Sequence, residues 1–165
     1  MRLRFKWILE KRIAISSIPR LIKDIEVWKE EGVKAVLILV EDHELYHFGG
    51  TKNYLELLKR KNFDVYHLPI RDFDIPTIDQ CLNAVKWVDE KLDEKKPVVI
   101  HCYGGLGRSG TIAACVLVYR YGFRPETAIQ VIRNIMPRSL ESPRQTFFVY
   151  EFYDSLRNES YSSFC

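Results

Sequence analysis

The sequence predicts an α/β fold with a central, mainly parallel sheet of four to five strands flanked by helices. Three apolar runs rich in β-branched residues show almost no alternation of polar and apolar positions, as expected of strands buried on both faces of a parallel sheet. Between these runs, apolar residues recur with the period of an α-helix. Parallel neighbours need crossover connections, so alternating strands and helices place helices over both faces of the sheet.

The elements follow one another in a simple order. The expected strands are 7–8, 13–15, 33–40, 63–70 and 97–101. The expected helices are one opened by Ile18-Pro19 and closed by Gly32, then 51–61, 77–92, one directly after the glycine-rich stretch 101–110, one starting at Pro125, and 141–156. The whole chain, 1–165, is expected to form a single domain with no linker or repeat, and residues 157–165 are expected as a frayed tail.

Composition limits the classes of function. A hydrophobic content of 47% in 165 residues is enough to close one core. The formal net charge of +3 is compatible with an anionic ligand but far short of the charge of a nucleic-acid-binding protein, so no nucleic-acid partner is expected. Nothing suggests an obligate oligomer, and a monomer is expected.

The cysteines and the N-terminal residues indicate the cellular compartment. The four cysteines form no CxxC pair, which excludes a disulfide framework or a zinc knuckle and favours a reducing compartment. The first sixteen residues lack the apolar core of a signal peptide, and no span approaches twenty apolar residues. We therefore expect a cytoplasmic protein that does not associate with membranes.

The stretch HCYGGLGRSG, residues 101–110, lies where the strand 97–101 gives way to a helix. Open α/β sheets bind ligands at the carboxyl ends of their strands. Successive backbone N–H groups of a glycine-rich turn, together with the free N–H groups of a helix start, bind a tetrahedral anion. Arg108 can add a bidentate grip on two phosphate oxygens. The loop residues expected to contact substrate are Tyr103, Gly104, Gly105, Leu106 and Gly107.

Cys102 lies in the centre of this positive field, which favours the thiolate over the thiol and makes the sulfur a nucleophile directed at phosphorus. Ser109 offers a hydroxyl that can stabilise the thiolate when it leaves, and His101 can orient the loop through its ring nitrogens. A buried, inert role is the ordinary one for a free cysteine, and we assign it to Cys81 and Cys115, whereas Cys165 is expected to be exposed.

The stretch matches the HC-x5-R-[S/T] signature, and the chain resembles the cysteine-dependent protein tyrosine phosphatases, in particular their compact, dual-specificity-like members of the archaeal and atypical kind. The similarity extends from FKWILEKRIAISSIPR through HLPIRDFDIP to the C-terminal helix. The resemblance implies hydrolysis of phosphotyrosine in a protein or peptide, without metal or other cofactor, through a cysteinyl-phosphate. It also implies inhibition by the oxyanions phosphate, vanadate and tungstate.

The resemblance implies a general acid upstream of the cysteine, and RDFDIPT offers two candidates, Asp72 and Asp74. Position after the strand favours Asp72, although Arg71 stands where the family usually has Gly or Pro. The segment MPRSLESPRQ resembles the one in which a glutamine positions the attacking water, which indicates Gln145. Arg138 departs from the family pattern there, and Glu141 is the alternative for that role.

Substrate choice is only partly indicated. A chain of 165 residues has little length for the loop that deepens the cleft in large tyrosine-specific phosphatases, which leaves dual specificity for phosphoserine and phosphothreonine open. No lysine lies between Cys102 and Arg108, whereas phosphoinositide phosphatases of the superfamily usually carry basic residues there. Lipid and RNA 5′-triphosphate substrates are therefore ranked low.

Other patterns compete with this interpretation. Gly105-x-Gly107-x-x-Gly110 fits a dinucleotide fingerprint, but the acidic strand end it requires is replaced by a helical segment. HELYH, 43–47, reproduces the HExxH pattern of zinc proteases, with too little room for the helix and no third ligand, so a surface loop is expected. A phosphotyrosine-binding module without activity would typically lack the cysteine, the arginine or the acid. Rhodaneses lack the arginine-serine ending of this loop, and in low-molecular-weight phosphatases the cysteine lies near the N-terminus and precedes the acid, so this sequence fits neither class.

Overall fold

The structure, a computed structural model, describes residues 2–162 and the side chains as far as residue 158. One five-stranded sheet has the order β1-β2-β5-β3-β4. Its strands are β1 (Phe5–Leu9), β2 (Ile13–Ser16), β3 (Ala35–Ile38), β4 (Asp64–His67) and β5 (Val98–His101). All neighbours are parallel except β1 and β2. The predicted α/β fold with a mainly parallel sheet is therefore confirmed.

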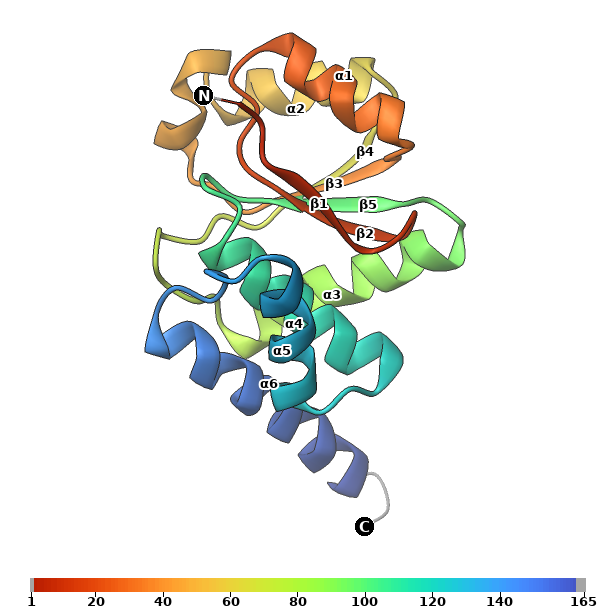
Figure 1. Ribbon diagram of the computed structural model, residues 1–165, viewed down its shortest axis with the longest axis vertical. Helices are drawn as coiled ribbons and strands as arrows, with labels where there is room; N and C mark the ends of the chain where they lie inside the picture. Colours follow the sequence, from red (N-terminus) through yellow and green to blue (C-terminus); the bar gives the residue numbers. More distant parts are fainter. Residues whose placement is uncertain (1, 163–165) are drawn as a thin grey trace.

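Helices cover both faces of the sheet. They are α1 (Ile22–Glu31), the 3-10 helix η1 (Asp42–Phe48), α2 (Thr51–Arg60), α3 (Ile78–Asp93), α4 (Gly107–Tyr121), α5 (Pro125–Ile135) and α6 (Pro143–Ser162). Figure 1 shows α1 and α2 over one face and α3 to α6 over the other. Among the helices, α4 is the most enclosed, with every residue from Gly107 to Val118 buried. The chain thus places its glycine-rich stretch between the central strand β5 and the central helix α4.

Strand register brings the functional loops together. Ser16 pairs with His101, His101 with Ile38, and Ile38 with His67. All four parallel strands therefore end at the same level, and the loops that follow them meet at one edge of the sheet. In Figure 1 this edge lies to the left, where the green strand β5 turns into α4.

Local sequence explains where two of the helices end or begin. Gly32 ends α1 in the left-handed conformation, with a φ of 95°, which glycine adopts without steric cost. Thr77 caps α3, because its hydroxyl accepts the Gln80 amide while the Gln80 side chain accepts the Thr77 amide. The Leu68 amide donates to the Ile38 carbonyl at 2.9 Å, so the long loop 68–77, which contains RDFDIPT, is fixed at both ends.

Three predictions need correction or stay outside the structure. The strands predicted over 33–40 and 63–70 are shorter, at Ala35–Ile38 and Asp64–His67. Helix α6 continues to Ser162, so the frayed tail predicted from residue 157 is wrong as far as that residue. Residues 163–165, with Cys165, lie outside the described part of the chain. No helix within that part is long and apolar enough to span a membrane.

Candidate active site

The loop between β5 and α4, residues 102–107, forms the centre of the site and is called the phosphate loop below. Cys102 begins it, with a side chain only 3% exposed. The backbone N–H of Gly105 donates to Cys102 Sγ at 3.3 Å. The loop therefore directs one backbone N–H donor at the sulfur atom.

Two glycines of the loop lie in close contact with other segments. Gly105 has a φ of 79°, and a Cβ there would lie 2.7 Å from the backbone of Ser16 and Ser17, so no larger residue fits at this position. A Cβ on Gly107 would lie 2.8 Å from the Glu141 carboxylate and 3.0 Å from the Gln145 amide, which are the ends of side chains. The phosphate loop therefore packs between the end of β2 and the start of α6.

Arg108 is a buried cation held by two elements far away in the sequence. Its side chain is 1% exposed. Nη1 and Nη2 each donate to one carboxylate oxygen of Glu44 at 2.8 Å, and Nη1 also donates to the Ile70 carbonyl at 2.8 Å. Burial alone would lower the pKa of Arg108, but the hydrogen bonds to Glu44 and the negative charges around it raise that pKa. The guanidinium is consequently always charged and fixed in orientation.

One edge of the Arg108 guanidinium is still free to bind an oxyanion. Nε is buried and has no hydrogen-bond partner among the residues that the structure describes. Nη2 has, besides Glu44, only the Asp72 carboxylate, with Oδ1 at 3.3 Å. Asp72 is 54% exposed and can move away. The expected bidentate grip on phosphate is therefore available through Nε and Nη2, while the outer edge is occupied by Glu44.

Glu44 is the functional residue that sequence reasoning missed. It lies in η1, directly after β3, and its side chain is 9% exposed. Burial raises the pKa of the Glu44 carboxyl, but hydrogen bonds from Arg108 and the Glu41 amide outweigh this effect and leave the pKa lowered. A buried arginine requires a carboxylate partner. That requirement, applied to the carboxylates that follow each buried strand, could have pointed to Glu44.

The HELYH stretch lies at the surface with both histidines exposed, as predicted, but it forms a 3-10 helix and not a loop, and it does not assemble a zinc protease site. It belongs to the 3-10 helix η1, in which residues four apart lie on different faces. His47 Nε2 lies 2.9 Å from the Pro19 carbonyl. In the described residues, the single group of three side chains close enough to share a metal ion is Glu41, His43 and Glu44, and Glu44 already binds Arg108.

Ser109 lies in the first turn of α4, with its hydroxyl buried and without a hydrogen-bond partner. The expected contact between this hydroxyl and the Cys102 sulfur is not formed. The first backbone amides of α4, from Gly107 to Ser109, have no acceptor within the helix, because helical hydrogen bonding starts with Gly110 donating to Leu106. These free N–H donors are able to bind an anion at the start of the helix.

His101 contacts the backbone of the phosphate loop as a neutral imidazole. The Cys102 carbonyl can only accept, so Nδ1 carries the proton and donates to it at 3.1 Å, while Nε2 accepts from the Tyr54 hydroxyl at 3.0 Å. Burial is the main reason that the pKa of His101 is lowered to about 4, and the charge of Arg108 adds to it. Burial also raises the pKa of Tyr54. Both side chains thus hold the backbone of Cys102 without carrying charge.

The two aspartates of the loop 68–77 lie differently. Asp72 faces Arg108, as described above, and its Oδ1 accepts the Phe73 amide at 3.0 Å. Asp74 Oδ1 accepts the Ile75 amide at 2.8 Å and lies 3.3 Å from Arg144. The structure therefore brings Asp72 next to the phosphate loop and leaves Asp74 paired with a helix residue.

Gln145 is fully buried in the first turn of α6. Its amide nitrogen donates to the Asp74 carbonyl at 3.3 Å, and its oxygen accepts the Ser142 amide at 3.1 Å. Gln145 thereby links the loop of the candidate acid to the start of α6, directly beside Gly107. Glu141, the alternative for water positioning, is exposed and also lies against Gly107.

The remaining predicted residues fall into two groups. Tyr103 is 37% exposed at the mouth of the site, whereas Gly104 and Leu106 are half-buried. Cys81 and Cys115 are buried in the core on α3 and α4, as predicted. Burial and the neighbouring Cys81 raise the pKa of the Cys115 thiol. Neither cysteine takes part in the site.

Comparison with known proteins agrees with this geometry. Residues 2–149 match the family described as PTP-SAK, Swiss Army Knife protein, DSP-PTPase phosphatase domain. Cyclin-dependent kinase inhibitor 3 of Rattus norvegicus is 32% identical over 136 residues, which cover 81% of this chain and 64% of the relative. Phosphatidylglycerophosphate phosphatase PTPMT1 of Arabidopsis thaliana is 30% identical over 152 residues, which cover 90% of this chain and 43% of the relative. The chain thus spans less than two thirds of the length of either relative.

A solved structure supports the same assignment over nearly the full fold. The crystal structure of Tk-PTP in the active form is 33% identical to this chain, with a TM-score of 0.80, and the match covers 91% of this chain and 96% of that one. The resemblance to compact, dual-specificity-like tyrosine phosphatases is thereby confirmed. This chain belongs to the PTP-SAK family of DSP-PTPase phosphatase domains.

Proposed function

We propose that this phosphatase hydrolyses phosphotyrosine, and also phosphoserine or phosphothreonine, in protein substrates through a cysteinyl-phosphate. The observation that carries the proposal is a pair of buried donors without partners, Arg108 Nε and Ser109 Oγ, directly after the phosphate loop. Buried polar groups nearly always have a partner. A phosphoryl group offers acceptor oxygens to both donors and to the free amides at the start of α4.

The first half of the proposed reaction forms a bond from sulfur to phosphorus. The Cys102 thiolate attacks the phosphoryl group, which Arg108 and the loop amides hold in place. The bond between phosphorus and the substrate oxygen breaks, and protonated Asp72 donates its proton to that oxygen. Substrate phosphate displaces Asp72 from Arg108 Nη2, so binding frees the carboxyl group for this role.

The second half returns the enzyme to its starting state. The Asp72 carboxylate takes a proton from a water molecule whose oxygen attacks phosphorus, and Gln145 helps to position that water. The bond between sulfur and phosphorus breaks, inorganic phosphate leaves, and the Ser109 hydroxyl stabilises the released thiolate. The net reaction converts a phosphomonoester and water into an alcohol and phosphate.

The decisive experiment is turnover of para-nitrophenyl phosphate and of phosphotyrosyl, phosphoseryl and phosphothreonyl peptides, with EDTA present. We expect hydrolysis by the wild type, loss in Cys102→Ser, and a phosphate adduct on Cys102 when the reaction is quenched in acid and analysed by mass spectrometry. Vanadate should inhibit the hydrolysis of all these substrates. Activity that survives Cys102→Ser, or that EDTA abolishes, would disprove the mechanism.

A phospholipid head group is the second candidate substrate, favoured by the 30% identity to Phosphatidylglycerophosphate phosphatase PTPMT1. The absence of lysine from the phosphate loop argues for peptides instead. Parallel assays of kcat/KM on phosphopeptides and on phosphatidylglycerophosphate in detergent micelles separate the two. A value of kcat/KM that is at least tenfold higher for the lipid than for any phosphopeptide would mean that the substrate is a phospholipid and not a protein.

A further inference from the structure

We propose that Arg133 is a positioning residue for the phosphate loop and acts through two peptide units that lie between its guanidinium and the start of α4. Arg133 lies in the last turn of α5 and takes no part in the chemistry described above. The inference rests on the proposed function, because it takes the anion bound at the start of α4 to be the phosphoryl group of the substrate.

The Arg133 guanidinium donates to the segment that connects α5 to α6. Nε donates to the Ser139 carbonyl at 3.1 Å. Nη2 donates to the Leu140 carbonyl at 3.2 Å and to the Thr146 hydroxyl at 3.4 Å. All three acceptors are neutral, so these bonds orient the backbone and do not balance a charge. The planar guanidinium fixes both carbonyls at once, because its donors have a rigid geometry.

The first peptide unit joins Ser139 to Leu140. A trans peptide is planar, and its C=O and N–H groups point in opposite directions. The carbonyl of this unit accepts from Arg133. Its N–H, on Leu140, donates to the Leu106 carbonyl of the phosphate loop at 3.2 Å. Arg133 therefore sets the direction of the N–H group that reaches the phosphate loop.

The second peptide unit joins Leu106 to Gly107. Its carbonyl accepts from the Leu140 amide and from the Gly110 amide, both at 3.2 Å. Its N–H, on Gly107, points the opposite way and is the first of the α4 amides that have no acceptor within the helix. If this unit turned over, the Leu106 carbonyl would face the anion and the Gly107 donor would be lost. The bond from Leu140 prevents that rotation.

The segment between α5 and α6 needs an external contact to keep its conformation. Leu140 has a φ of 58°, in the left-handed region that residues with a Cβ rarely adopt. Such a residue persists only where its surroundings hold it. Ser139 and Leu140 are buried against α4, where a Cβ on Gly110 would lie 3.0 Å from the Ser139 side chain. The two bonds from Arg133 hold the carbonyls immediately before and after the Leu140 Cα.

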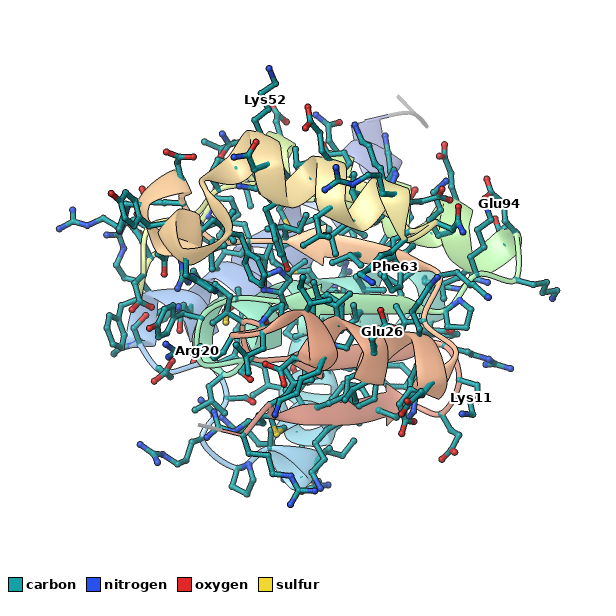
Figure 2. All side chains as sticks on the ribbon, turned by 90° about the horizontal axis from the view of Figure 1, so that it is seen from above. Lys11, Arg20, Glu26, Lys52, Phe63 and Glu94 are labelled. Carbon is teal, nitrogen blue, oxygen red and sulfur yellow. The ribbon has the colours of Figure 1, made fainter. Side chains whose placement is uncertain are left out.

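The same segment also contacts the loop of the candidate acid, because the Ser142 hydroxyl donates to the Phe73 carbonyl at 3.0 Å. Figure 1 shows the blue segment before α6 beside the start of α4. Figure 2 shows the start of α6 at the end of the molecule where Arg20 lies, opposite Lys11 and Glu94. The segment that Arg133 holds therefore lies at the edge of the sheet where the candidate site is built.

The test measures tungstate binding and amide exchange, neither of which needs turnover. Isothermal titration calorimetry gives the affinity for tungstate, and hydrogen–deuterium exchange with mass spectrometry gives the protection of residues 102–109 and 139–146. In Arg133→Met, which removes every donor, tungstate should bind about tenfold more weakly, as expected for one lost charge-assisted hydrogen bond. Exchange should become faster in both segments. Arg133→Lys offers a single point donor and should give intermediate values.

Two control variants separate this role from a loss of charge or of stability. Arg138→Met removes one positive charge from an exposed position of the same segment and should change neither tungstate affinity nor exchange. Ile132→Ala removes buried volume from α5, so it should lower the free energy of unfolding. Below its melting temperature this variant should bind tungstate as the wild type does.

Each outcome decides the proposal. Tungstate affinity in Arg133→Met equal to that in Ile132→Ala, or faster exchange confined to residues 139–146, overturns it. If Arg133→Met does not fold, Arg133→Lys decides: weaker tungstate binding than in the wild type supports the proposal, and equal binding overturns it. If the wild type binds no tungstate, the proposed function fails, and the exchange of residues 102–109 in Arg133→Met alone decides the role of Arg133.

Discussion

Glu44 and Arg108 form a bidentate ion pair, with both Nη atoms of the arginine 2.8 Å from the two carboxylate oxygens. The pair joins η1 to the start of α4 and leaves the Nε edge of Arg108 directed at the phosphate loop. Because the Arg108 side chain is 1% exposed, its charge has no compensation from solvent. Glu44 therefore sets both the charge balance and the orientation of the guanidinium that is proposed to bind phosphate.

Replacing Glu44 by Gln should damage both stability and activity. The amide nitrogen of glutamine would face an N–H donor, so one hydrogen bond of the pair is lost and the Arg108 charge is left unbalanced. Breaking a buried pair typically costs about 3–5 kcal/mol, and a misplaced guanidinium should lower kcat/KM about a hundredfold. Chemical denaturation and steady-state kinetics measure the two effects. Glu56→Gln, at an exposed position on α2, should change neither the free energy of unfolding nor kcat/KM. If Glu44→Gln changes these two quantities no more than Glu56→Gln does, the role of Glu44 is refuted.

The general acid can be assigned by comparing Asp72→Asn with Asp74→Asn. Asp72 lies beside Arg108, whereas Asp74 lies 3.3 Å from Arg144. Loss of the acid should slow hydrolysis by about 10²–10⁴ when the leaving group is poor, and much less for para-nitrophenyl phosphate, whose leaving group departs without help. The ratio of kcat values on phosphoseryl peptide and para-nitrophenyl phosphate reports this. A larger change of that ratio in Asp74→Asn would transfer the role to Asp74.

Much of this architecture could be predicted from the sequence because it depends on local patterns. The buried strands read as continuous apolar runs, and Cys102 and Arg108 lie within one short stretch. Asp72 could be proposed as the acid because the loop that contains it follows a recognisable strand, and the structure places it 3.3 Å from Arg108. Strand and helix ends were less accurate, since α6 continues to Ser162 through residues that carry no apolar period of their own.

What the sequence did not reveal depends on contacts between distant segments. Glu44 and Arg108 are 64 residues apart, and only the shared level of the strand ends brings them together. Arg4 reaches Gly104 across 100 residues because β1 pairs with β2. Composition cannot identify either contact, because it gives the number of arginines and not which residue lies next to each of them.

Gly105→Ala should abolish phosphate binding, and Gly122→Ala provides its control. Both glycines have positive φ, 79° and 70°, so alanine causes backbone strain of about 1–2 kcal/mol at either position. Only at Gly105 does the new Cβ also collide with backbone, 2.7 Å from Ser16 and Ser17, whereas nothing lies within 4 Å at Gly122. We expect Gly105→Ala to lose vanadate binding in isothermal titration calorimetry and Gly122→Ala to retain it. Normal vanadate affinity in Gly105→Ala would contradict the described loop geometry.

Stability should depend on His101 over a defined pH range. Burial lowers the pKa of the folded His101 to about 4, whereas its unperturbed value is 6.5. Between these values the unfolded chain binds a proton that the folded chain does not, so the free energy of unfolding falls as pH falls from 6.5 to about 4. The slope is at most about 1.4 kcal/mol per pH unit for one proton.

The measurement is urea denaturation at half-unit steps across this range, in the wild type, His101→Gln and His43→Gln. Gln at position 101 lowers stability at every pH, because the bonds to Tyr54 and Cys102 change, but it removes the titrating group and should flatten the slope. His43 is exposed, so its replacement should leave the slope as in the wild type. Carboxyl groups whose pKa is lowered in the folded protein, such as Glu44, add a slope of the same sign at lower pH, so the variants are compared above about pH 5.5. A slope in that range that is unchanged in His101→Gln would mean that another group binds the proton, and the neutral imidazole next to Cys102 would then have to be abandoned.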